Sequence, residues 1–138
     1  MVVATQTKIV VPFYDIDPMN IVWHGNYVKY IEVARCDFFA QVGYTYSDMY
    51  SEGIMYPIAK IDLKFIKSAY FGQELVVKSI LKEIEPAIIF KYEIRDAKTG
   101  EKICTANTMQ IGVDVKTKQT RHEAPKTLVE KLERFGHD

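Results

Sequence analysis

The fold is decided by residues 24–42, which read HGNYVKYIEVARCDFFAQV. Apolar side chains recur within this stretch at steps of three and four residues, namely Tyr27, Ile31, Ala34, Phe38 and Val42. That spacing is the period of one face of an α-helix. Further apolar side chains at positions 28, 30 and 39 widen the face, so we expect the helix to be buried on more than one side. Gly43 follows the stretch and is suited to end the helix in the left-handed conformation.

The segments around this helix predict an antiparallel sheet. Five of them have the character of strands, at residues 8–14, 59–65, 74–84, 88–95 and 102–114. The first is rich in β-branched residues, and the others alternate in the way typical of strands with one face on a core and one in water. We therefore predict the α+β class, with a sheet of about five strands wrapped around one long central helix.

Three other segments complete the chain. Residues 15–25 contain Pro, Asn and Gly and predict an irregular loop. Residues 45–53 are expected to be a short helix or irregular. The stretch from Pro125 to Gly136 has the pattern of a short amphipathic helix with proline in its first turn. With no repeat or linker between these segments, we expect a single domain over residues 1–138.

Composition excludes several classes of protein. The chain is 48% hydrophobic, too apolar for an intrinsically disordered protein. It carries 18 basic and 18 acidic side chains, and this zero net charge argues against nucleic acid as the main partner. No apolar run approaches the roughly 20 residues of a membrane span. Because the N-terminus lacks the pattern of a signal peptide, we expect a cytoplasmic protein.

The predicted architecture also predicts self-association. One sheet around one helix leaves unpaired strand edges and a second face to be covered. A second copy of the chain would cover both, so we expect a homodimer or a homotetramer.

Residues 14–27, which read YDIDPMNIVWHGNY, contain most of the potentially reactive groups. They place two carboxylates, an imidazole and an amide between a strand and the start of the helix. The first backbone N–H groups of a helix lack an intrahelical acceptor and can stabilise negative charge on a carbonyl oxygen. A carboxylate beside them can attack that carbonyl or deprotonate a water molecule. The stretch therefore indicates acyl transfer.

Three motifs resemble a known family. They are DIDP at residues 15–18, IVWHGNY at residues 21–27 and EVAR at residues 32–35. Together they resemble the signature of the 4-hydroxybenzoyl-CoA thioesterases and of the related acyl-CoA thioesterases associated with the bacterial Tol-Pal system. The resemblance implies a hotdog fold, hydrolysis of an acyl-CoA to a free acid and coenzyme A, no metal or other cofactor, and a homodimer in which two sheets continue one another.

The resemblance also assigns roles to individual residues. Asp17 matches the catalytic aspartate, which acts as a nucleophile or general base. His24 matches the position whose backbone N–H polarises the thioester carbonyl, and a histidine there favours the acyl-CoA branch over the aromatic-acid branch. Asn26 and Tyr27 match the turn into the helix, where they would bind substrate or position the loop. Gly25 departs from the small residue or proline usual in relatives, and is expected to loosen the start of the helix slightly.

Several neighbouring residues have simpler explanations. We expect Asp15 to be structural and to bond its own backbone, as aspartates in turns commonly do. Glu32 and Arg35 are expected to form a local ion pair on one helix. Cys36 and Cys104 are expected to be small buried hydrophobic residues rather than metal ligands.

The sequence leaves three alternatives to acyl-CoA hydrolysis. A hotdog domain can bind acyl-CoA or dock a partner without catalysis, because a fold alone does not establish an activity. The Asp-Ile-Asp motif also resembles the aspartate-nucleophile phosphatases, but those need a parallel sheet, Mg²⁺ and further carboxylates downstream. A zinc site from Asp17, His24, His122 and His137 is the third, and its spacings match no close pair of ligands.

Overall fold

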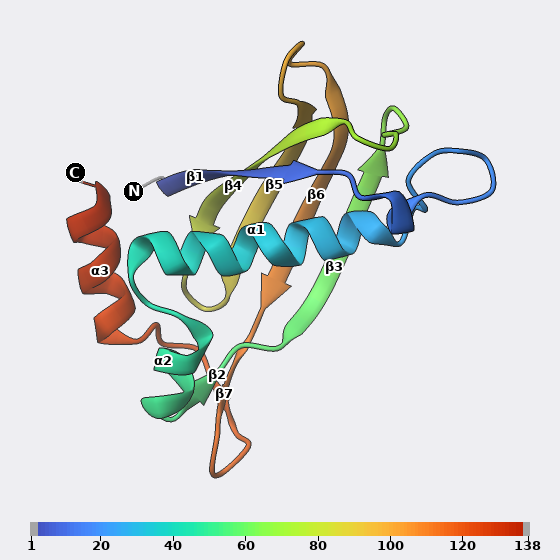
Figure 1. Ribbon diagram of the computed structural model, residues 1–138. Coiled ribbons are helices and arrows are strands. Elements are labelled where there is room, and N and C mark those ends of the chain that lie inside the picture. The colour runs from blue at the N-terminus through green and yellow to red at the C-terminus, as the bar shows by residue number, and fades with distance from the viewer. Residues whose placement is uncertain (1–2, 137–138) are drawn as a thin grey trace.

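The computed structural model describes residues 3–136 and has the predicted α+β architecture (Figure 1). Its main sheet is antiparallel, and its strands lie in the order β1 (Val3–Val10), β4 (Glu74–Glu83), β5 (Ile88–Asp96), β6 (Lys102–Gln110) and β3 (Ile58–Phe65). The long helix α1 (Asn26–Val42) lies across one face of this sheet. The prediction of a five-stranded sheet around a central helix is therefore confirmed.

The apolar stripe of the sequence is the face that α1 buries. All five residues that defined the stripe are buried, and Tyr30 and Phe39 extend the buried surface around the helix as expected, whereas Val28 is only partly buried. Gly43 ends α1 with a φ of 90° and donates its N–H to the carbonyls of Phe39 and Ala40. The helix begins at Asn26, two residues after the predicted start, because His24 and Gly25 form the preceding turn.

The first strand was predicted too late in the chain. Strand β1 covers Val3–Val10 and pairs along its whole length with β4, from Val3 opposite Leu81 to Val10 opposite Glu74. Pro12 follows it and has no N–H with which to extend the ladder. The chain then forms a short 3₁₀ helix, η1 (Phe13–Asp15), instead of continuing as a strand.

The fourth predicted strand after the helix is split in two. Strand β6 ends at Gln110, and β7 (Gly112–Asp114) joins a second sheet between β2 (Ile54–Met55) and β8 (Thr120–Arg121). This small sheet was not predicted. Gly112 permits its close pairing, because a Cβ at that position would lie 2.8 Å from the carbonyl oxygen of Arg121.

Two shorter helices pack beside the sheet. Helix α2 (Tyr46–Ser51) lies in the segment expected to be a short helix or irregular, and Thr45 and Asp48 form a capping box at its start. Helix α3 (Lys126–Gly136) is the predicted terminal helix and buries Leu128 and Leu132. None of the helices in residues 3–136 is long and apolar enough to cross a membrane.

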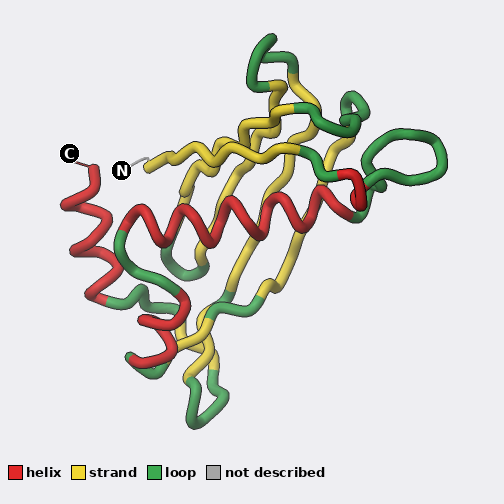
Figure 2. The backbone as a smooth tube through the Cα atoms, viewed as in Figure 1, coloured by secondary structure: helices red, strands yellow, loops and turns green. Residues whose placement is uncertain are grey.

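The loops that matter for function gather at one end of the molecule. Figure 2 shows the long loop between β1 and α1 extending beyond the sheet at the end where α1 begins. The connection between β3 and β4 contacts it there. The N–H of Val22 donates to the carbonyl of Ala69 at 2.9 Å, and the N–H of Val11 donates to the carbonyl of Gln73 at 3.0 Å.

Candidate active site

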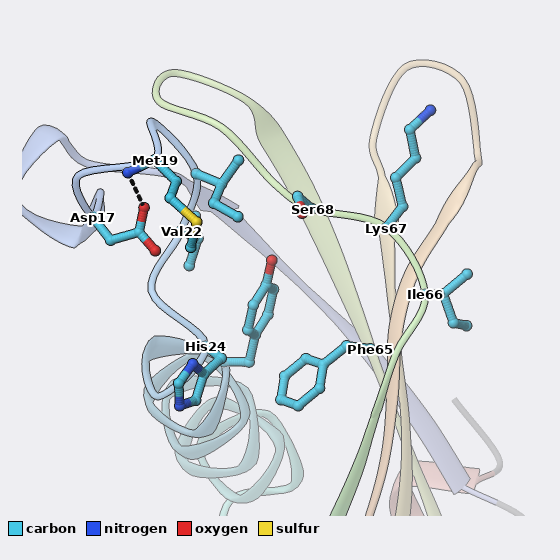
Figure 3. A pocket seen from close by; sticks show the side chains of 10 residues that line it. Asp17, Met19, Val22, His24, Phe65, Ile66, Lys67 and Ser68 are labelled. Carbon is cyan, nitrogen blue, oxygen red and sulfur yellow. Dashed lines mark hydrogen bonds between the residues drawn. The ribbon is translucent and has the colours of Figure 1, made fainter.

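A cavity of about 310 Å³ lies between the β1–α1 loop, the start of α1 and the residues that follow β3 (Figure 3). Its apolar lining comes from Met19, Ile21, Val22, Tyr27, Phe65 and Ile66. Polar groups are contributed by Asp17, His24, Lys67 and Ser68. The two residues predicted to be catalytic, Asp17 and His24, therefore lie on the same cavity. Its opposite wall, from the end of β3 and the residues after it, was not predicted from the sequence.

Asp17 lies in a tight turn that leaves part of its carboxylate free. Its N–H donates to the carbonyl of Ile21 at 2.8 Å, and Asn20, with a φ of 64°, closes the turn by donating its N–H to the carbonyl of Asp17 at 3.0 Å. The Oδ1 atom accepts the N–H of Met19 at 2.8 Å (Figure 3). The Oδ2 atom has no hydrogen-bond donor within residues 3–136. A half-buried carboxylate with one free oxygen can attack a carbonyl or deprotonate water.

His24 contributes an exposed imidazole and a free backbone donor. Its ring centroid lies 5.2 Å from that of Trp23 and 6.2 Å from that of Phe65. The His24 carbonyl accepts the N–H of Tyr27 at 3.4 Å. For the backbone N–H groups of His24 and Gly25, no acceptor is found in the described part of the chain. These two N–H groups precede the first residue of α1, where the helix dipole adds to their preference for negative charge.

Asn26 and Tyr27 are placed differently from one another. The Asn26 side-chain amide does not line the cavity and donates to the carbonyl of Asp15 at 3.0 Å. Tyr27 is buried and lines the cavity, and its hydroxyl accepts the N–H of Ala69 at 3.1 Å. Burial raises the pKa of Tyr27, so the hydroxyl keeps its proton at neutral pH. That proton has no acceptor among the described residues. The roles of both residues in substrate binding stay predictions.

Asp15 has different contacts from those predicted. The prediction that its side chain bonds its own backbone is wrong, because the carboxylate is buried and faces α1. Its Oδ1 atom lies 2.5 Å from Nζ of Lys29, and its Oδ2 atom accepts the hydroxyl of Tyr30 at 2.7 Å. Burial and this hydrogen bond raise the pKa of Tyr30 well above its ordinary range.

Arg35 belongs to a buried network that the sequence did not predict. Its guanidinium donates to Glu32 at 2.5 Å, as expected, but also to the hydroxyls of Tyr46 at 2.7 Å and Tyr92 at 3.4 Å. Arg35 is only 2% exposed, so the Arg35 end of this ion pair is buried. The network joins α1 to α2 and β5 and lies outside the residues that line the cavity.

The two cysteines differ in their exposure to solvent. Cys36 is exposed, so the prediction that it is buried is wrong, whereas Cys104 is buried as predicted. Burial raises the pKa of the Cys104 thiol to about 11. Of the candidate zinc ligands, His137 lies outside the described residues. Residues 3–136 contain no cluster of three or more His, Cys, Asp or Glu side chains suited to a metal ion.

Comparisons with known proteins give a consistent result. The sequence pattern of the thioesterase-like superfamily matches residues 11–132. The chain is 29% identical over 112 residues, 80% of each chain, to a putative acyl-CoA thioesterase, YneP, of Bacillus subtilis. Its structure matches that of a DHNA-CoA thioesterase from Staphylococcus aureus with a TM-score of 0.83 and 26% identity, over 97% of this chain and 93% of the other.

A solved structure of a 4-hydroxybenzoyl-CoA thioesterase shows the same fold at lower identity. It matches with a TM-score of 0.80 and 18% identity, over 93% of this chain and 97% of the other. The hotdog fold implied by the sequence resemblance is therefore confirmed. All pairings in the main sheet are antiparallel, which contradicts the parallel sheet that the phosphatase alternative requires.

Proposed function

The chain belongs to the thioesterase-like superfamily, and on that premise we propose that it hydrolyses an acyl-CoA thioester to a free acid and coenzyme A at the cavity beside Asp17. One observation carries the proposal. Within residues 3–136, a carboxylate with one oxygen that accepts no hydrogen bond and a histidine whose backbone N–H donates none line the same partly apolar cavity. Acyl transfer needs both groups, one to supply the oxygen nucleophile and one to stabilise the oxyanion.

The reaction can follow two balanced routes from Asp17. In the first, its Oδ2 atom attacks the thioester carbonyl, the thiolate leaves and takes up a proton, and water then cleaves the mixed anhydride. In the second, Asp17 takes a proton from a water molecule as the water attacks the carbonyl, and the proton passes to the departing sulfur. In both routes, the backbone N–H of His24 donates to the carbonyl oxygen as its charge increases. The apolar lining contacts the acyl group and excludes water.

We further propose that the active enzyme is a homodimer or homotetramer assembled through β3. This strand is an edge of the main sheet, and most of its side chains are exposed on both faces. Phe65, which lines the cavity, is 53% exposed at the end of β3. A second β3 would pair the free edge and cover this wall. Light scattering should then give two or four times the 15.9 kDa of one chain, and a fully active monomer would contradict the assembly.

The release of coenzyme A from a panel of acyl-CoAs tests the reaction. Asp17→Asn keeps the shape of the side chain and removes its charge, so we expect turnover to fall by about 10²–10⁴-fold. Asp114→Asn is the matched control, because the Asp114 carboxylate also accepts the N–H of the second residue after it, at 2.9 Å, in a turn outside the cavity.

Each outcome of this experiment has a clear meaning. Loss of turnover in Asp17→Asn, with the parental rate in Asp114→Asn, supports the catalytic role. The parental rate in Asp17→Asn contradicts it. Binding of acyl-CoA by the parent without any release of coenzyme A would favour the non-catalytic hotdog module instead.

A further inference from the structure

Asp15 is a buried carboxylate that the proposed reaction does not use. Its side chain is 3% exposed and contacts two residues of α1, Lys29 through Oδ1 and Tyr30 through Oδ2. Burial of a carboxylate is unfavourable unless charge and hydrogen bonds compensate for the lost water. Both compensating groups come from the first two turns of α1. The carboxylate therefore fixes the chain at Asp15 to the beginning of the helix.

The backbone of Asp15 contacts the other end of the same loop. Its carbonyl accepts the N–H of Trp23 at 3.0 Å and the side-chain amide of Asn26 at 3.0 Å. Trp23 directly precedes His24, and Asp15 precedes Asp17 by two residues. One residue thus contacts the helix through its side chain and joins the two ends of the loop through its carbonyl.

The loop between these ends is narrow and closed. Ile16 and Val22 pair as an isolated antiparallel bridge, and the N–H of Asp17 donates to the carbonyl of Ile21 at 2.8 Å. Its tip is in solvent, where Met19 is 73% exposed. Because little packs against the tip, its position relative to α1 depends on the contacts at its base.

From these contacts we propose that Asp15 is a positioning residue for the reaction, acting together with Lys29 and Tyr30. It fixes the base of the loop to α1, so that the Asp17 carboxylate and the His24 N–H reach the same carbonyl group. The inference rests on the proposed function of these two residues. A displacement of about 1 Å between reacting groups can cost about 100-fold in rate, so a small shift of the loop has a large effect on kcat.

Tyr30→Phe tests the proposal with a small change. It removes the hydroxyl that donates to Asp15 and leaves the ring in place. Tyr44→Phe is the matched control. Tyr44 is also buried, and its hydroxyl donates to the Glu52 carboxylate at 2.8 Å. This pair lies beyond the opposite end of α1. Both changes should lower the Tm. Only Tyr30→Phe should lower kcat, by about 10- to 100-fold, with little change in KM.

Combination with Asp17→Asn separates positioning from general stability. If Tyr30 acts through the loop that carries Asp17, Tyr30→Phe should not slow Asp17→Asn further, although it should lower the Tm of both backgrounds equally. The parental kcat in Tyr30→Phe, or an equal loss of kcat in Tyr44→Phe, would overturn the positioning role. So would a full additional loss of kcat in the double variant. The parental rate in Asp17→Asn alone would instead contradict the proposed function.

Asp15→Asn provides the second, stronger perturbation. It keeps the shape of the side chain but removes the charge that faces Lys29 and one of the two acceptor oxygens. We expect a larger loss of kcat than in Tyr30→Phe, measured on the folded fraction determined by circular dichroism. A folded Asp15→Asn protein with the parental kcat would overturn the inference.

Discussion

Gly25 lies directly beneath the indole ring of Trp23. A Cβ at position 25 would lie 2.2, 2.4 and 2.8 Å from three carbons of that ring, and real Cβ atoms essentially never approach closer than 3.0 Å. The backbone of Gly25 is right-handed helical, with φ −66° and ψ −23°, so any residue could adopt it. The ring, and not the backbone, therefore opposes a side chain at position 25. The expected slight loosening of the helix start stays a prediction.

Gly25→Ala should have two opposing effects on the free energy of unfolding. The new methyl group would displace the indole by about 1 Å. Burial of a large side chain stabilises the fold by roughly 1.5–3 kcal/mol. Because Trp23 is 52% exposed, displacement of its ring can lose about half of this, or roughly 1 kcal/mol. Replacement of glycine by alanine in a compatible conformation stabilises by about 0.4–1 kcal/mol through the unfolded chain. The two effects nearly cancel, and Gly25→Ala should change the Tm little.

The same substitution should behave differently without the ring. In a Trp23→Ala background only the stabilising effect remains, so Gly25→Ala should raise the Tm by about 1–4 °C. Thermal unfolding of the parent, the two single variants and the double variant measures the coupling. An equal change in Tm in both backgrounds would refute the contact between Gly25 and Trp23.

Three further predictions concern single residues. His24→Ala keeps the backbone N–H, whereas His24→Pro removes it and should lower turnover by about a further 10²–10³-fold. Equal turnover in the two variants, with similar circular dichroism spectra, would contradict the oxyanion role of this N–H. At pH 8 a thiol reagent should modify Cys36 in the folded protein and Cys104 only after unfolding, because Cys104 is buried and burial raises its pKa to about 11. Rapid modification of both cysteines in the folded protein would contradict this. The side chain of Gln73 and nearby backbone N–H groups lower the pKa of Asp96 to about 2. The stability that Asp96 adds is therefore complete above about pH 4 and lost as the pH falls toward 2, and Asp96→Asn should flatten the Tm profile in that range.

The sequence predicted the helices and strands that are long enough for their apolar side chains to recur at a regular spacing. Such a pattern needs about two turns of a helix or several residues of a strand. The prediction missed residues 3–7 of β1, because the inward positions there include Thr5 and Thr7 rather than large apolar residues. Pairing with β4 decides that strand, and a single sequence carries no direct signal of pairing. The small sheet was missed for a similar reason. Its strands β2 and β8 have two residues each and β7 has three, too few to show a period.

The candidate site was predicted only as far as it is local in sequence. Asp17, His24 and Tyr27 lie within one loop and the first turn of one helix, where a motif can be recognised. The wall from Phe65 to Ser68 comes from the end of β3 and the residues after it, about 40 residues away along the chain, and only the sheet topology brings it to the loop. Such contacts depend on the tertiary structure, and no regular spacing of residues along the sequence indicates them.

The two aspartates of the Asp-Ile-Asp motif show what the structure adds to the sequence. As residue types they are equal candidates for the reacting carboxylate. Both oxygens of Asp15 are engaged, by Lys29 and Tyr30, and its side chain is removed from solvent and from the cavity. Asp17 lines the cavity and accepts one described hydrogen bond, at one of its oxygens. A nucleophile or base needs a free lone pair within reach of the substrate. For the proposed reaction, the Asp17 oxygen without a described hydrogen bond favours this residue as the reacting group, and the contacts of Asp15 with α1 favour the positioning role proposed for it.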